Sequence, residues 1–393
     1  MTRYLIMARA LRAFADGYVA ILLPAYLLAL GLHTWQVGIV ATATLLGSAA
    51  ATLAVGAWGH LRHPRQLLRA AALLMAFTGV AFAAATSFWP LLLIAFVGTL
   101  NPSSGDVSVF LPLEHARLAE AAQGDARTAL FARYSLTGAL CAALGALATG
   151  LPDHMVYAAG MSRLDALRTM FVLYGLIGGL VWLLYRQLPA PHVDEVVTPP
   201  APLSASKAVV IRLAALFSVD SFAGGLVVNA LMALWLLQRF ALSLSNTGLF
   251  FMWVGLLSAL SQLAAPWLAK RIGLLNTMVF THIPASLCLI GAAFAPHVEW
   301  ALGLLLVRAL LSQMDVPARS AFVMSVVTPA ERAAAASFTA VPRSLASALG
   351  PTLGGALFAA GWLAAPLVMC GTLKIAYDLA LWRAFRSQQF SDQ

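Results

Sequence analysis

The chain has 393 residues, of which 61% are hydrophobic and only 10% are charged, and its formal net charge is +9. Soluble domains carry about 25% charged residues, so this composition excludes a soluble globular protein and predicts an integral membrane protein. Apolar runs of about 20 residues recur along the chain, whereas an outer-membrane barrel would show short alternating segments, so we predict an all-α membrane fold. The basic residues lie at the ends of the apolar runs, which the positive-inside rule explains without a nucleic-acid partner.

Six membrane-spanning helices are predicted in the first part of the chain. They lie at about residues 8–30, 36–58, 67–87, 89–113, 128–150 and 165–186. The first follows a cluster of arginines and is too long for a cleaved signal peptide, so we interpret it as an uncleaved span. The fourth contains Asn101–Phe110 (NPSSGDVSVF), whose proline and glycine we expect to kink the helix without ending it.

Residues 187–206 form the predicted linker between two halves. Five prolines and few apolar residues predict an extended, flexible, cytoplasmic segment. It separates an N-terminal bundle, residues 1–186, from a C-terminal bundle, residues 207–393. The second six spans are predicted at about residues 208–239, 246–269, 274–295, 298–325, 333–358 and 363–386.

The two halves repeat several residues in the same order. Asp16 corresponds to Asp220, and Asp106 corresponds to Asp315. The repeats indicate a duplicated six-helix unit, which is typical of transporters that alternate access around a central site. Basic residues at the N-terminus, in the linker region and after alternate spans predict that both termini are cytoplasmic. The segment from Met155 to Arg168 is predicted to be a loop on the opposite side.

Several loops resemble those of the major facilitator superfamily. "GAWGHLRHPRQL", from Gly56, and "PWLAKRIGLLN" resemble its basic loop between spans two and three, with His60 where the family has an acid. "TPAERAAAAS", from Thr328, resembles the loop after span ten. "LGPTLGG", Leu349–Gly355, resembles an antiporter pattern, although that pattern belongs on span five and not span eleven.

The resemblance implies two pseudo-symmetric six-helix bundles that transport a small molecule. The group that the chain resembles most is that of bacterial drug or metabolite exporters, which implies a monomer in the bacterial inner membrane. The corresponding gating loops would contain Arg62, Arg65, Lys270, Arg271 and Arg332.

Charged side chains inside predicted spans are the main candidates for function, because each costs about 3 kcal/mol or more at mid-membrane. The candidates for proton coupling or substrate contact are Asp16, Asp106, Asp220, Asp315, Arg308, Arg133 and Arg343. Among the acids, Asp220 has no close basic neighbour in sequence, which makes it a candidate proton carrier.

Local pairing is the alternative explanation for each of these charges. Helical spacing places Arg12 near Asp16, and Lys374 near Asp378. Similar depths in neighbouring spans favour an Asp106–Arg133 pair, and the repeat then predicts Asp315–Arg343, with Arg319 and Arg308 as other partners for Asp315. These pairs can be fixed braces or can break during transport. His282 lies in a span that is peripheral in the family, so we expect it to serve packing.

Five further residues are secondary candidates for lining the substrate cavity. They are Tyr18, Tyr26, Phe110, Asn229 and Gln313. The three cysteines lack the spacing of a metal site, and the sequence has no phosphate-binding or metalloenzyme motif. We therefore expect that the protein binds no cofactor or metal and is not an enzyme.

The sequence favours proton-coupled efflux, with a small molecule, protons and the lipid bilayer as partners. Two alternatives stay open. One is proton-coupled import of a small anionic metabolite, with Arg308 as the anion contact. The other is a membrane sensor or scaffold that transports nothing.

Overall fold

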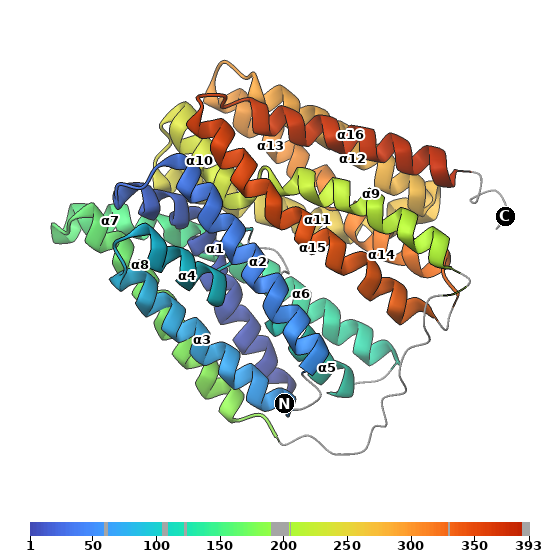
Figure 1. Cartoon of the computed structure of the whole chain (residues 1–393), viewed down its shortest axis with the longest axis horizontal. Helices are drawn as coiled ribbons and strands as arrows, with labels where there is room; N and C mark the ends of the chain where they lie inside the picture. The colour runs from blue at the N-terminus through green and yellow to red at the C-terminus, as the bar shows by residue number, and fades with distance from the viewer. Residues whose placement is uncertain are drawn as a thin grey trace. The chain divides into compact units, whose positions relative to one another are not determined.

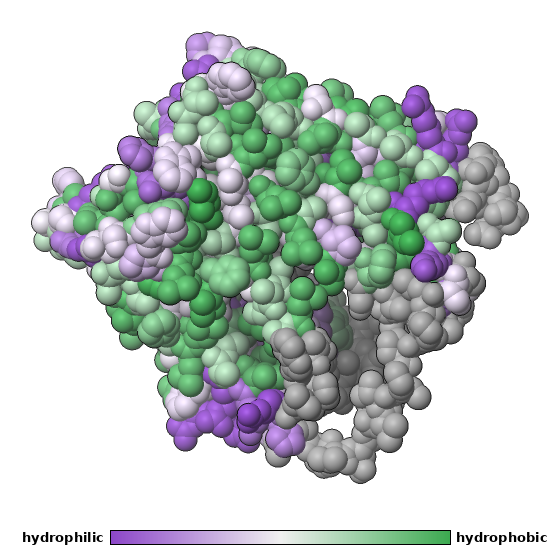
Figure 2. All heavy atoms as spheres, in the orientation of Figure 1, coloured by the Kyte–Doolittle hydropathy of each residue, from purple (hydrophilic) through white to green (hydrophobic). Residues whose placement is uncertain are grey.

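The computed structural model describes residues 1–58, 62–103, 109–121, 124–189, 204, 206–328 and 331–386, and within these ranges it contains helices and no strand. Nine segments of the described chain are long and apolar enough to cross a membrane. Hydrophobic side chains cover most of the face seen in Figure 2, and hydrophilic ones gather toward the ends of helices. This exposed apolar surface confirms the predicted all-α membrane fold.

The chain divides into two compact units, which we call unit 1 and unit 2. Unit 1 comprises Met1–Asp194 and Val228–Met252, and unit 2 comprises Glu195–Val227 and Trp253–Gln393. Unit 1 contains α1 (Thr2–Ala29), α2 (Thr34–Trp58), α3 (Pro64–Ala84), α4 (Phe88–Val97), α5 (Phe110–Ala121), α6 (Gly124–Leu147), the short 3₁₀ turn Ala148–Gly150, α7 (Leu151–Ala159), α8 (Arg163–Arg186), α10 (Asn229–Phe240) and the beginning of α11 (Leu244–Ile272) (Figure 1).

Unit 2 holds the remaining helices and the rest of α11. These helices are α9 (Lys207–Gly225), α12 (Leu274–Ala293), α13 (Val298–Ser312), α14 (Asp315–Ser325), α15 (Arg332–Ala359) and α16 (Ala365–Phe385). Within this unit α9 packs along α15, and α12 packs against α13 and α16 (Figure 1). A core of buried apolar residues from α9, α12, α14 and α16 includes Phe217, Met278, Phe322 and Leu381.

Small residues set the closest helix contacts in both units. In unit 1, a Cβ on Gly79 of α3 would lie 2.3 Å from the backbone nitrogen of Gly175 on α8. In unit 2, a Cβ on Gly350 of α15 would lie 2.3 Å from the carbonyl carbon of Gly225 on α9. No side chain fits at these positions, so the helix backbones touch directly, as is common where helices associate inside a bilayer.

Three of the predicted spans are discontinuous, which corrects the expectation of unbroken helices at 89–113, 208–239 and 298–325. The first is divided into α4 and α5, the second into α9 and α10, and the third into α13 and α14. The polar stretch after α4 therefore ends the helix and does not merely kink it. Asp106 and residues 104–105 and 107–108 lie outside the described residues.

Local hydrogen bonds satisfy backbone groups at the α4–α5 break. The Asn101 side-chain oxygen accepts from both the nitrogen and the hydroxyl of Ser103. The carbonyl of Pro102 accepts a 2.9 Å hydrogen bond from the nitrogen of Ala230, at the start of α10. Irregular backbone is tolerated within membrane protein only where such partners exist, so these bonds explain how the break is stable.

The predicted loop from Met155 to Arg168 is partly helical. It contains the end of α7, where Gly160 caps the helix with a φ of 63°. The next helix, α8, begins after Ser162, whose hydroxyl accepts a hydrogen bond from the backbone nitrogen of Asp165. Nearby, Thr149 donates to the carbonyl of Leu244 over 3.1 Å, which ties the turn before α7 to the beginning of α11.

A buried carboxylate fastens the chain just before α9 to the turn before α15. Glu331 accepts hydrogen bonds from the nitrogen and hydroxyl of Ser204, at 2.5 and 2.8 Å, and from the nitrogen of Ser206 at 3.0 Å. Thr328 also donates to Glu331 and, through its nitrogen, to the Ser206 hydroxyl. Hydrogen bonds from Ser206 and Ser204 hold the pKa of the Glu331 carboxyl well below its usual range.

We expect Glu331→Gln to lower the thermal unfolding midpoint of the purified protein at neutral pH, because the amide accepts fewer hydrogen bonds than the carboxylate. Since the folded-state pKa is depressed, this stabilisation is fully present above pH 4.5, the usual value, and is lost as the pH falls below it. The difference between wild type and variant should therefore be constant at neutral pH and shrink in acid. Glu299→Gln, at an exposed position in α13, is the control. Equal midpoints for wild type and Glu331→Gln at neutral pH would refute the role of this carboxylate.

Candidate functional site

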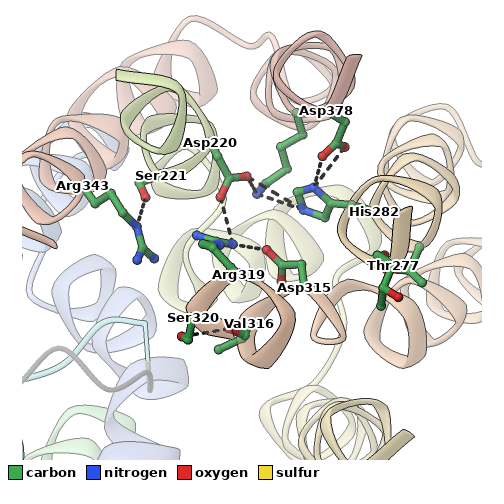
Figure 3. A network of polar contacts seen from close by, with 12 residues as sticks. Asp220, Ser221, Thr277, His282, Asp315, Val316, Arg319, Ser320, Arg343 and Asp378 are labelled. Carbon is green, nitrogen blue, oxygen red and sulfur yellow. Dashed lines mark hydrogen bonds and ion pairs between the residues drawn. The ribbon is translucent and has the colours of Figure 1, made fainter. Parts of the chain in front are cut away.

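Unit 2 contains a cluster of charged side chains contributed by four helices (Figure 3). We call it the Asp220 cluster, and its members are Asp220 on α9, His282 on α12, Asp315 and Arg319 on α14, and Lys374 and Asp378 on α16. Asp220, His282 and Asp378 are only 4%, 4% and 0% exposed. Charges buried to this degree are stable only when each is paired.

Asp220 is the centre of the cluster. One of its carboxylate oxygens lies 2.5 Å from the Nζ of Lys374, and the other lies 3.3 Å from a terminal nitrogen of Arg319. The Nε2 of His282 lies 3.9 Å from the first oxygen. A single carboxylate therefore connects α9 with α12, α14 and α16.

Asp315 and Arg319 form an ion pair within one helix. Four residues separate them on α14, so they share a helical face. Asp315 is also the first residue of α14, directly after the break at Gln313 and Met314. A negative charge at a helix N-terminus is stabilised by the unpaired backbone N–H groups there, so the break itself favours an acid at this position.

His282 connects Lys374 to Asp378. Its Nδ1 lies 3.1 Å from Asp378, and its Nε2 lies 3.4 Å from the Nζ of Lys374. An ammonium group can only donate, so the contact with Lys374 requires Nε2 to accept. This geometry fits an imidazole whose Nδ1–H donates to Asp378 and whose Nε2 accepts from Lys374.

The charges of the cluster do not cancel when His282 is neutral. Three carboxylates face two permanent cations, Arg319 and Lys374, which leaves one negative charge. One added proton makes the cluster neutral. In a buried environment of low dielectric constant, uncompensated charge is costly.

Unit 1 contains a buried ion pair of a different kind. Glu114 on α5 accepts from Arg12 on α1 and from the hydroxyl groups of Tyr134 and Tyr185, the last at 2.6 Å. The Arg12 guanidinium lies 4.2 Å from the ring centroid of Phe110. Glu114 and Arg12 are 0% and 2% exposed, and the carboxylate is surrounded by donors. This one carboxylate therefore joins α1, α5, α6 and α8.

The structure corrects most of the predicted local pairs. Arg12 pairs with Glu114 and not with Asp16. Asp220, predicted to lack a partner, is the most heavily paired acid of the cluster. Asp315 pairs with Arg319 and not with Arg343, because Arg319 lies one turn away on the same helix.

On α16, Lys374 and Asp378 do not pair with each other. The long side chain of Lys374 reaches Asp220, while Asp378 contacts His282. The prediction that His282 serves packing alone was therefore wrong. The sequence held one signal for this site, since two charges four residues apart in an apolar span share a face that must meet polar groups on a neighbouring helix.

Other predicted site residues lie apart from the cluster. Tyr18 and Tyr26 donate to the carbonyls of Met170 and Phe82, so their hydroxyls join helices of unit 1. Asn229 begins α10 and Gln313 follows α13, both at helix breaks. Arg133 is exposed on α6, and its predicted pair with Asp106 falls partly outside the described residues.

The predicted gating arginines make few contacts. Arg65 donates to the carbonyl of Arg186, and Arg271 lies 4.2 Å from the ring centroid of Trp267. Arg62 is exposed, and the side chain of Arg332 lies outside the description, as does His60. In the described part of the chain, no group of His, Cys, Asp and Glu side chains could hold a metal ion.

We expect strong coupling between Asp220 and Lys374 in a double-mutant cycle. Asp220→Asn or Lys374→Met alone should destabilise the protein by about 3–5 kcal/mol, because each leaves a buried charge without its partner. The double variant should recover part of that loss, with a coupling energy on the order of 1–3 kcal/mol measured by thermal or denaturant unfolding.

The exposed pair Asp165–Arg168 provides the matched control. The same substitutions there, Asp165→Asn and Arg168→Met, should cost less than about 1 kcal/mol each. Additive effects at Asp220 and Lys374 would show that the two side chains do not form a pair.

The chain is similar in fold to several solved transporters. It matches the nucleoside transporter NupG with a TM-score of 0.76 at 16% identity, covering 98% of both chains. It matches a bacterial homologue of the human lysosomal transporter Spinster with a TM-score of 0.74 at 16% identity, covering 98% of this chain and 94% of the other. A D-xylose–proton symporter gives a TM-score of 0.73 at 15% identity, with 96% and 97% covered. At these identities the likeness shows the fold alone.

Sequence comparison gives the family. The chain is 22% identical to a Saccharomyces cerevisiae protein described as uncharacterized membrane protein YJR124C, over 94% of this chain and 91% of the yeast protein. The family model for the Major Facilitator Superfamily matches residues 5–314, which is most of the chain. Together with the helical fold and its discontinuous spans, this match shows that the chain belongs to the Major Facilitator Superfamily of membrane transporters.

Proposed function

We propose that the protein is a proton-coupled secondary active transporter of a small molecule, in which the Asp220 cluster carries the coupled proton. The observation that carries this proposal is the position of His282 between Lys374 and Asp378 in a buried cluster with one surplus carboxylate. Histidine is the side chain whose ordinary titration lies nearest neutral pH. A titratable group at such a position links protonation to the pairing of all six residues.

A proton on Nε2 of His282 would change which groups can pair. The imidazolium has no acceptor nitrogen, so it cannot receive a hydrogen bond from Lys374 and instead repels the ammonium group. Its new N–H faces the oxygen of Asp220 that Lys374 occupies, at 3.9 Å. Two cations then compete for one carboxylate oxygen, and the network must rearrange.

The helices that meet at the cluster are suited to transmit such a rearrangement. Asp220 lies five residues before α9 ends at Gly225, and Asp315 begins α14 after a break in the span. Ends of discontinuous membrane helices are the places where transporters commonly bind ions and substrates. A change of pairing at Asp220 would act directly on both breaks and so favour one state of an alternating-access cycle.

Export in exchange for protons is the direction that we propose, on the likeness of Leu349–Gly355 to an antiporter pattern. The proposal places a monomer in the bacterial inner membrane with both termini cytoplasmic, as the distribution of basic residues favours. The same cluster could serve uptake with a proton, and the sign of the driving gradient distinguishes the two.

Proteoliposomes with an imposed pH gradient test the proposal. Substrates are first identified by a thermal-shift screen at two pH values, and their flux is then measured with the interior acidic or alkaline. Antiport predicts accumulation when the interior is acidic, and symport predicts accumulation when it is alkaline. Flux that is the same with and without a gradient would refute proton coupling.

His282→Gln isolates the proton step. The glutamine amide can donate to Asp378 and accept from Lys374, as the neutral imidazole does, but it cannot titrate. We expect this variant to retain exchange without a gradient and to lose gradient-driven accumulation. His33→Gln, at an exposed position between α1 and α2, is the control and should keep both activities. Full gradient-driven accumulation by His282→Gln would remove His282 from the mechanism.

A further inference from the structure

Arg343 lies beside the Asp220 cluster but does not belong to it. It is half-buried on α15, and its Nε donates to the hydroxyl of Ser221 on α9 over 3.3 Å. The guanidinium carbon lies 6.0 Å from the ring centroid of Phe217, one turn earlier on α9. Figure 3 shows Arg343 joined to Ser221 and to no other drawn residue. The contacts with α9 therefore orient the guanidinium, and no described residue accepts a hydrogen bond from its two terminal nitrogens.

No carboxylate of the described residues lies within ion-pair distance of Arg343. Asp220 and Asp315 attract the Arg343 guanidinium electrostatically, but Asp220 is already paired with Lys374, and Asp315 with Arg319. Some buried side-chain nitrogens and oxygens of the described residues lack a hydrogen-bond partner, but no nitrogen of Arg343 is one of them. The two terminal nitrogens, for which no described residue supplies an acceptor, therefore keep some exposed surface.

The sequence predicts that α15, which carries Arg343, spans the membrane, and a charged side chain inside a span is costly without a partner. Arginine does not escape this cost by losing its proton, because its guanidinium stays charged in proteins. Its planar group donates two parallel hydrogen bonds to a carboxylate or phosphate. The missing partner is therefore an anion with two oxygens in one plane.

We infer that Arg343 binds a carboxylate or phosphate group of the transported molecule, with Ser221 as its positioning residue. This inference rests on the proposed transport function and adds the chemical class of the substrate. Arg308, on α13, also lacks an acidic partner among the described residues, but no hydroxyl or ring orients it there; its charge lies near Cys288 and Cys370. The geometry thus favours Arg343 over Arg308, which the sequence had favoured as the anion contact.

Thermal unfolding of the purified full chain with matched ligands tests the inference. The probes are benzoate with benzamide, phenyl phosphate with phenol, and succinate with succinamide, all at one pH and one ionic strength. We expect stabilisation by anionic members and none by their neutral partners. Arg343→Gln should weaken binding of a stabilising anion by about tenfold or more, and Arg343→Lys and Ser221→Ala should weaken it less.

Arg308→Gln is the matched control, because it also removes one intramembrane arginine. It should leave anion affinity unchanged. The inference is overturned if neutral partners stabilise equally, if no anion stabilises, or if the Arg343 and Arg308 variants lose affinity alike. The same unfolding measurement is repeated with vesicles of phosphatidylglycerol. If this lipid alone stabilises the protein, and Arg343→Gln abolishes that stabilisation, the site binds a lipid headgroup and not a transported anion.

The measurement is independent of proton coupling. It uses no gradient, and His282→Gln should bind the stabilising anion as wild type does. Wild-type flux that ignores a pH gradient, together with intact anion binding, would therefore contradict the proposed coupling alone. Gradient-driven transport by the wild type without anion binding through Arg343 would contradict only the role of Arg343.

Discussion

The ion pair between Asp220 and Lys374 is the constraint on which the arrangement of unit 2 depends. Both side chains come from helices that are mostly apolar, and Asp220, which is buried, would lose its nearest cation without Lys374. Arg319 contacts the second oxygen of Asp220, so the N-terminal part of α14 must face α9. The apolar core around Phe217 and Phe322 fills the space next to these charges, so packing and charge pairing specify the same helix positions.

The two units use buried charge differently. In unit 1, Glu114 is surrounded by Arg12, Tyr134 and Tyr185, all of which donate to its two carboxylate oxygens. In unit 2, three carboxylates, two cations and His282 contact one another across four helices. One unit thus buries a single carboxylate among hydrogen-bond donors, whereas the other buries a network of several charges.

The sequence predicted the helical membrane fold, because the apolar segments are long and the charged residues are few. It did not predict the breaks after Val97, Gly225 and Ser312, because apolar length alone does not reveal where tertiary hydrogen bonds replace helical ones. The intramembrane acids were recognised, since their cost in a bilayer singles them out. Their partners were mostly missed, because pairing depends on which helices face each other: Lys374 reaches α9, while Asp378, one turn later, reaches α12.

The central claim is that the Asp220 cluster gains and loses a proton as a unit. Infrared difference spectroscopy of the purified protein between mildly acidic and mildly alkaline pH measures this directly, through carboxyl and imidazole bands. The account predicts difference bands that disappear or shift together in Asp378→Asn and His282→Gln and persist in Glu114→Gln. Difference bands that are identical in the cluster variants and the wild type would contradict it.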